Sequence, residues 1–212
     1  MKFLSPDSKF AQFMTSVGEM MLLNACWILF SLPLVTMGTS NIAMYTLLGR
    51  RLRGEGAGTV VPFFRAWISN LKQGIPFWLA QVFMSCSLGL MLLIPVPVFM
   101  KVVAAVLLVL ATLVFSLIYP QIARYRNRWF AYLRNALILL IAKPGRTLLN
   151  LLLFLFPAAI FFLAPEAFLQ WGFIWILFGF SGLFYLSARI VQKILLPLEE
   201  LSEDRPTVKI TY

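Results

Sequence analysis

The stretch Ile75–Val96, IPFWLAQVFMSCSLGLMLLIPV, decides the fold class, because it is long and contains no charged residue. A helix of about 20 apolar residues crosses the hydrocarbon core of a membrane, which is ~30 Å thick. Three later runs are similarly apolar: Val102–Ile122, Thr147–Leu163 and Phe168–Ile190. A segment in hydrocarbon must pair its own backbone groups, and a β-barrel would show shorter, alternating segments. We therefore predict transmembrane helices.

The composition of the whole chain agrees with this prediction. Of its 212 residues, 61% are hydrophobic and only 12% are charged, whereas about 25% of the residues of a soluble domain are charged. The length leaves room for about four to six spans and their connections. We predict an all-α fold, a polytopic transmembrane helix bundle with interfacial amphipathic helices, in which residues 1–212 form a single integral membrane domain.

The first apolar region, Met20–Leu48, is interrupted by Pro33 and Gly38, which we identify as a helix break. Proline removes a backbone donor and glycine permits a sharp bend. One interpretation is a single broken helix, which gives five spans and which the short length of Thr39–Leu48 favours. The other is a helix from about Ala11 to Leu34 with a shorter helix returning from Thr39, which gives six spans.

Basic residues are distributed unevenly between the apolar runs. Two connections, residues 50–73 and 124–146, hold most of them, namely Arg50, Arg51, Arg53, Arg65, Lys72, Arg124, Arg126, Arg128, Arg134, Lys143 and Arg146. The other two connections hold only Lys101. Because positive residues stay on the cytoplasmic side, we predict a multi-pass cell-membrane protein with both basic loops and the tail 191–212 in the cytoplasm. The net charge of +10 then requires no nucleic-acid partner.

The segment Pro62–Gln73 is the candidate surface for a partner. Its apolar residues recur at helical spacing and its polar residues fill the other side, which predicts an amphipathic helix lying in the headgroup plane. Such a helix is either a positive-inside anchor for the next span or a docking element. The residues that we assign to partner contact are Phe63, Phe64, Arg65, Trp67, Asn70, Leu71 and Gln73.

A second candidate surface consists of Arg124, Arg126, Arg128 and Arg134. We expect these cations to fix the topology and to contact anionic lipids, with ~1 kcal/mol for each cation near the surface; a specific partner site is the other interpretation. The few polar residues inside the spans are expected to bond across helices. They are Asn24, Gln81, Ser85, Ser87, Thr112, Ser116 and Ser181.

Catalytic and metal-binding side chains are scarce. The chain has no histidine, only two cysteines, and no Asp or Glu between residues 55 and 166. A Ser-His-Asp triad is therefore impossible, and a metal site or an intramembrane carboxylate for ion coupling is disfavoured. We predict a protein that is not an enzyme and that binds no cofactor.

The block 24–74 carries a more specific pattern. It contains Asn24 and Trp27, then Leu32-Pro33-x-Val35-Thr36-x-Gly38, Ala43-x-Tyr45, Phe63-Phe64-Arg65 and Asn70-x-x-Gln73. This pattern resembles the signature of the YesL-like family, small multi-pass membrane proteins of Gram-positive bacteria. The family more often has a further Phe and Lys where this chain has Ala66–Ser69. The family's biochemical activity is not established, and the resemblance implies association with the permease subunits of ABC sugar importers.

Three functions are compared. We expect an accessory or interaction subunit associated with a carbohydrate ABC importer. The alternative is an independent transporter or permease component for a small solute, although Glu55–Gly58 is a poor match to the coupling loop of an ABC permease. A membrane enzyme would need an acid, a base or a metal site, and the sequence offers almost none.

Overall fold

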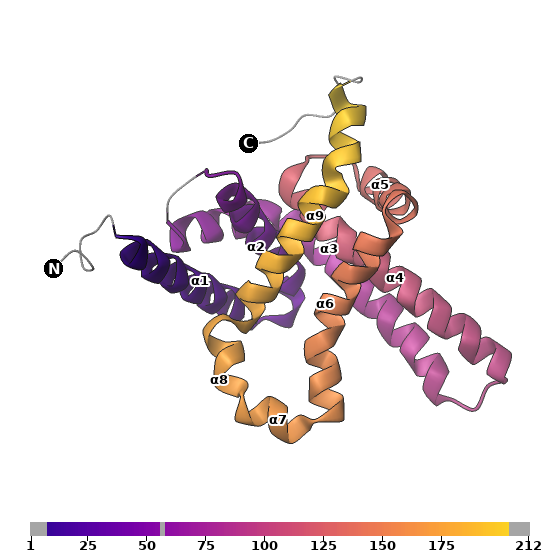
Figure 1. Cartoon of the computed structure of the whole chain (residues 1–212). Coiled ribbons are helices and arrows are strands. Elements are labelled where there is room, and N and C mark those ends of the chain that lie inside the picture. Colours follow the sequence, from indigo (N-terminus) through magenta and orange to yellow (C-terminus); the bar gives the residue numbers. More distant parts are fainter. Residues whose placement is uncertain (1–7, 56–57, 204–212) are drawn as a thin grey trace.

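The computed structural model describes residues 8–55 and 58–203, which are almost entirely helical and contain no strand (Figure 1). The main helices are α1 (Lys9–Ser31), α2 (Met37–Leu52), α3 (Val60–Leu93), α4 (Val98–Arg124), α5 (Trp129–Ala142), α6 (Pro144–Leu163) and α9 (Phe180–Glu203). Short elements connect them, namely a 3₁₀ turn, η1 (Leu34–Thr36), two short helices, α7 (Pro165–Gln170) and α8 (Gly172–Ile174), and a π-helix, η2 (Trp175–Gly179). The all-α prediction is confirmed.

Five of the described helical segments are long and apolar enough to cross a membrane. They are Phe10–Ser31, Val60–Leu93, Val98–Arg124, Pro144–Leu163 and Gly172–Leu195. The last four coincide over most of their length with the apolar runs that identified the fold class. The prediction of a polytopic membrane bundle is therefore confirmed at the level of the helices, and five is the number that the broken-helix interpretation gave.

The first region nevertheless differs from a single broken helix. α1 and α2 form an antiparallel hairpin, because Glu19 pairs with Arg51 at 3.4 Å and Trp27 donates to Asn41 at 2.9 Å. In each pair, one residue precedes the turn and the other follows it, at about the same number of residues from the turn. The chain thus turns back at residues 32–36, which is the local geometry of the alternative interpretation, although α2 has only 16 residues.

The segment Pro62–Gln73 is also not a separate helix. It is the first part of α3, a continuous helix of 34 residues that includes Pro76. At 1.5 Å per residue such a helix is about 51 Å long, well over the thickness of the hydrocarbon core. The segment therefore does not form an independent helix in the headgroup plane, because the helix continues through Pro76 into the apolar run.

Two predicted loops are largely helical. The connection 124–146 contains α5, and the connection 50–73 contains the end of α2 and the beginning of α3. The predicted tail, residues 191–212, is helical as far as Glu203, and Val191, Ile194 and Leu195 are buried in the core. The rest of that tail lies outside the described residues.

The core is organised around α2. Most of its side chains between Gly38 and Leu48 are buried, because α1, α3, α4 and α9 all pack on it. In Figure 1, α3 and α4 extend together away from this centre as a two-helix arm, whereas α6 and α9 form a second branch joined by α7 and α8. The helix α1 lies across the direction of α6 and α9 in the same view.

Candidate functional site

The residues assigned to partner contact do not share one environment. Phe63 is fully buried, and Phe30 of α1 packs on Phe63 and on the half-buried Trp67, with ring centroids 5.7 and 5.2 Å apart. The amide of Asn70 donates to Ala66 O in its own helix, 2.8 Å away. Phe63 and Trp67 therefore hold α3 against α1 and are not available to a partner.

The exposed part of the same segment forms one face. Val61, Phe64, Arg65, Ile68 and Lys72 are all exposed, at spacings of three or four residues along the helix. We call these five residues the outer face of α3. Leu71 and Gln73 lie at its edge and are half-buried. Apolar and basic side chains thus stand together on a helix that continues directly into an apolar span.

The hairpin turn is built by Pro33 and Thr36. Pro33 has no N–H to continue α1, and its carbonyl accepts from the backbone N–H of Thr36 at 2.7 Å. The Thr36 hydroxyl lies 2.8 Å from Phe30 O, at the end of α1, and 2.8 Å from Pro33 O. Thr36 therefore satisfies a carbonyl that the end of the helix leaves without an intrahelical partner.

Gly38 has a different role from the predicted one. It is not at the bend but inside α2, where an added Cβ would lie 2.6 Å from both Gly74 O and Trp78 Cβ. A Cβ on Gly74 would in turn meet the Thr39 side chain at 2.5 Å. The two glycines let the backbones of α2 and α3 touch, so Gly38 serves close packing, and only Pro33 of the predicted pair breaks the helix.

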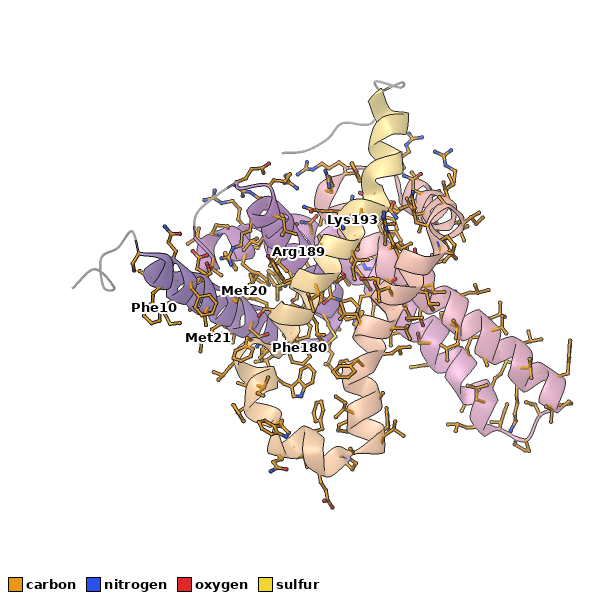
Figure 2. The ribbon with its side chains drawn as sticks, viewed as in Figure 1. Phe10, Met20, Met21, Phe180, Arg189 and Lys193 are labelled. Carbon is orange, nitrogen blue, oxygen red and sulfur yellow. The ribbon has the colours of Figure 1, made fainter. Side chains whose placement is uncertain are left out.

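Asn24 joins α1 to the π-helix. Its buried amide donates to Trp175 O and Ile176 O at 3.0 and 2.7 Å, and its oxygen accepts from the Ser181 N–H at 2.8 Å. A π-helix shifts the backbone pairing by one residue and leaves groups without α-helical partners. Figure 2 shows Phe180 close to α1, and its ring lies 4.6 Å from that of Trp27. Asn24 thus stabilises an irregular segment far away in the sequence.

A second buried polar chain links α2, α9 and α6. The hydroxyls of Tyr45 and Ser187 are 2.6 Å apart, and Ser187 donates to Asn150 Oδ1 at 2.6 Å. The Asn150 Nδ2 atom is buried and has no hydrogen-bond partner. Neutral groups alone form this chain, so it can orient helices or accept a water molecule but offers neither an acid nor a nucleophile activated by a base.

Other intramembrane polar residues behave partly as predicted. Gln81 accepts from the Tyr119 hydroxyl across the α3–α4 pair, as Asn24 bonds across α1 and η2. The hydroxyls of Ser87, Thr112, Ser116 and Ser181 instead donate to carbonyls of their own helices. The predicted cross-helix bonding is thus confirmed for the two amides, whose longer side chains reach a neighbour, and not for these hydroxyls.

The signature residue Gln73 reaches α5. Its Oε1 atom accepts a long hydrogen bond of 3.4 Å from the buried hydroxyl of Tyr132, which also donates to Tyr125 O at 2.8 Å. Burial raises the pKa of Tyr132. The tyrosine therefore stays neutral and acts as a structural donor that holds α5 against the middle of α3 and the end of α4.

Most of the arginines lie in the two basic connections, around the ends of α2 and α4 and in α3 and α5. Two of the arginines are paired, Arg51 with Glu19 at 3.4 Å and Arg53 with Glu55 at 2.7 Å, and the Arg53 guanidinium lowers the pKa of Glu55. Of the four predicted lipid-contacting residues, Arg126, Arg128 and Arg134 are exposed around the start of α5. Arg124 is half-buried, 6.0 Å from the centroid of the Tyr125 ring.

The geometry offers little for catalysis. Within residues 8–55 and 58–203, no three His, Cys, Asp or Glu side chains come together as a metal site would require. Cys26 is buried and Cys86 is exposed on α3, and neither forms a disulfide. The arrangement is a junction of helices with an exposed face on α3.

The role of Thr36 is testable by substitution. Thr36→Val keeps the shape and removes the hydroxyl, which is expected to lower the free energy of unfolding by about 1 kcal/mol. Thr46→Val is the matched control, because the Thr46 hydroxyl bonds only to Ile42 O in its own helix. Thermal unfolding of both variants in detergent measures the difference; equal unfolding temperatures would contradict the assigned role of Thr36.

Comparison with known proteins finds a match for one part of the chain. No curated protein and no solved structure matches the chain. One family model matches residues 20–93, and its description is "Protein of unknown function, DUF624". The match begins in α1 and ends with α3, so it contains the hairpin, the paired glycines and the outer face of α3. The chain therefore carries a DUF624 domain over about a third of its length.

Proposed function

We propose that this protein is a non-enzymatic accessory subunit of the cell membrane that associates with the permease subunits of a carbohydrate ABC importer. The importer class comes from the resemblance of residues 24–74 to the YesL-like family of Gram-positive bacteria. The lack of clustered acids, bases and metal ligands in the described residues supports a binding role. The DUF624 domain itself has no assigned function.

The observation that carries the proposal is the outer face of α3. Phe64 and Ile68 are each close to half exposed and are flanked by the exposed Arg65 and Lys72. Large apolar side chains beside arginine are typical of the centre of a protein interface. This face lies at the basic end of the helix, where we predict cytoplasm, so it suits a cytoplasmic loop or helix of a permease that presents apolar and acidic side chains.

The test is a change confined to this face. Phe64→Ser together with Ile68→Ser removes two apolar side chains that are close to half exposed. Because the Phe64 ring also lies 5.6 Å from that of Phe30, Ile68→Ser alone is made beside it to leave this packing intact. Trp67→Ser would disturb the same packing from a more buried position. We expect the double variant to insert into the membrane normally and to lose most of the permease that co-purifies with the wild-type protein in mild detergent. Quantitative mass spectrometry of the eluates measures the loss.

A matched control is available on α5. Phe130 is 85% exposed and lies outside the outer face of α3, so Phe130→Ser tests the general effect of losing an exposed phenylalanine. We expect this variant to retain its partner. Equal recovery of the permease with the double variant and with wild type would refute the outer face as the contact.

A further inference from the structure

We infer that the α1–α2 hairpin does not cross the membrane and that its apolar turn, residues 32–36, is embedded in the lipid of the cytoplasmic leaflet. The surface concerned is this turn, and its partner is the acyl-chain region of the bilayer. This goes beyond the proposed function and does not depend on it. It puts the N-terminal end of α1 on the same side of the membrane as the basic connections 50–73 and 124–146.

The first step is to find which residue of α3 lies beside the hairpin turn, at the same height along the helix axis. α2 and the first part of α3 are antiparallel, because Arg51 donates to Thr59 at 2.7 Å and Gly38 touches Gly74. Gly38, immediately after the turn, is therefore level with Gly74. The cations of α3, Arg65 and Lys72, both precede Gly74 and are exposed.

The second step is the length of α3 that remains after Gly74. Ile75–Leu93 contains no charged residue and is about 29 Å long, which is the thickness of the hydrocarbon core. This part crosses the membrane, so Gly74 lies at its cytoplasmic boundary. Gly38 and the hairpin turn then lie at the same boundary.

A hairpin that crossed the membrane would put the charged and the apolar parts of α3 in the wrong surroundings. With the turn on the far side, Gly74 would also be there, Lys72 would be exposed to hydrocarbon, and the apolar Ile75–Leu93 would project into water. A single crossing by α1 is inconsistent with the pairs Glu19–Arg51 and Trp27–Asn41, which bring the chain back beside itself. Both alternatives fail on contacts within the protein.

The surface of α1 is less apolar than that of the other long helices. Phe10, Met14, Met21, Ala25 and Leu29 follow one another at helical spacing and are exposed or half-buried. They form an apolar stripe that points away from the core; Figure 2 shows Phe10 and Met21 along it. The first half also has a polar stripe, Gln12, Ser16 and Glu19, and α1 has the lowest mean hydropathy of the five long helices, 1.4. We expect this polar stripe to face water on the cytoplasmic side of the membrane.

The turn continues the same surface. Leu32 and Leu34 are 69 and 70% exposed and Val35 is 48% exposed, so the turn presents apolar side chains and no charge. A turn in the cytoplasm would expose them to water. A turn that dips into the acyl chains of the cytoplasmic leaflet covers them, in continuity with the exposed apolar surface of α3 and α4.

Cysteine labelling with a membrane-impermeant maleimide tests the inference. The background is the full chain with Cys26→Ala and Cys86→Ser, shown by size-exclusion chromatography to behave as wild type. Single reporters are Ser16→Cys on the polar stripe of α1 and Val35→Cys at the turn. Controls are Ser69→Cys, exposed in the basic part of α3, and Glu166→Cys, exposed in α7 at the opposite end of α6.

Each outcome decides between the topologies. We expect Ser16→Cys and Ser69→Cys to react only in inverted vesicles, Glu166→Cys to react only in intact cells, and Val35→Cys not to react in intact cells. Reaction of Ser16→Cys in intact cells would show that α1 crosses once, and reaction of Val35→Cys in intact cells would show that both helices cross. A Ser16→Cys that reacts from neither face would place the polar stripe in hydrocarbon and would equally overturn the inference.

Discussion

Replacing Gly38 by alanine is expected to lower the unfolding temperature of the protein in detergent by about 3–10 °C. The added Cβ would lie 2.6 Å from Gly74 O and from Trp78 Cβ, and neither atom can move without shifting a helix. Overpacking of this kind typically costs about 1–3 kcal/mol, and each kcal/mol corresponds to roughly 2–4 °C in a protein of this size. Gly74→Ala is expected to have a similar effect, since its Cβ would meet Thr39.

Gly89→Ala is the matched control in the same helix, α3. A Cβ at this position meets nothing within 4 Å, so the unfolding temperature should not fall. Heating the purified variants and following the monomer peak by size-exclusion chromatography gives both values. If Gly38→Ala were as stable as Gly89→Ala, the close contact of α2 with α3 would be contradicted.

The second large effect is expected for Asn24→Ala. This change removes two hydrogen bonds to the π-helix and one to the first turn of α9, and it leaves Trp175 O, Ile176 O and the Ser181 N–H without their side-chain partner. A buried polar group without a partner costs about 1–3 kcal/mol in a soluble protein and less between membrane helices, so we expect a total loss of roughly 2–4 kcal/mol. The same thermal measurement detects it.

Asn70→Ala separates this effect from the general loss of an asparagine. The Asn70 amide bonds to Ala66 O and to Ser69 Oγ, in its own helix, so its removal should cost much less than that of Asn24. A further variant, Asn24→Asp, keeps an acceptor for the Ser181 N–H but loses the donor and faces two carbonyls with a charge. We expect it to be no more stable than Asn24→Ala; wild-type stability would contradict the assigned contacts.

The fold class and the four later spans could be predicted because hydrophobic length is a local property of the sequence. The run that begins at Val102 lies within α4, and all but the last three residues of the run that begins at Ile75 lie within α3. No contact had to be known to find either run. The predicted break at Pro33 is confirmed for the same reason, since proline ends a helix through its own backbone. α5 was missed because Arg134 and the flanking cations made an apolar 14-residue helix resemble a loop.

The junction itself could not be predicted, because it depends on pairs of residues far apart in the chain. The spacing of Trp67 in the sequence predicts that it belongs to an amphipathic face. Only its contact with Phe30 of α1 shows that Trp67 faces inward. Asn24 and Tyr45 were visible as signature residues, but their partners, Ser181 and Ser187, are more than 130 residues away and belong to no recognisable motif. In the sequence, Gly74 is only the last residue of the block 24–74. Its role in close packing depends on Gly38, which lies opposite it in the neighbouring helix.

The most direct test of the proposed function is purification of the tagged wild-type protein from its native membrane in mild detergent, followed by quantitative mass spectrometry. An accessory subunit is expected to recover permease subunits of one ABC sugar importer in a fixed ratio, and to lose them when Phe64 and Ile68 are changed to serine. Recovery of the protein alone, in several detergents and with the sugar present, would contradict the account.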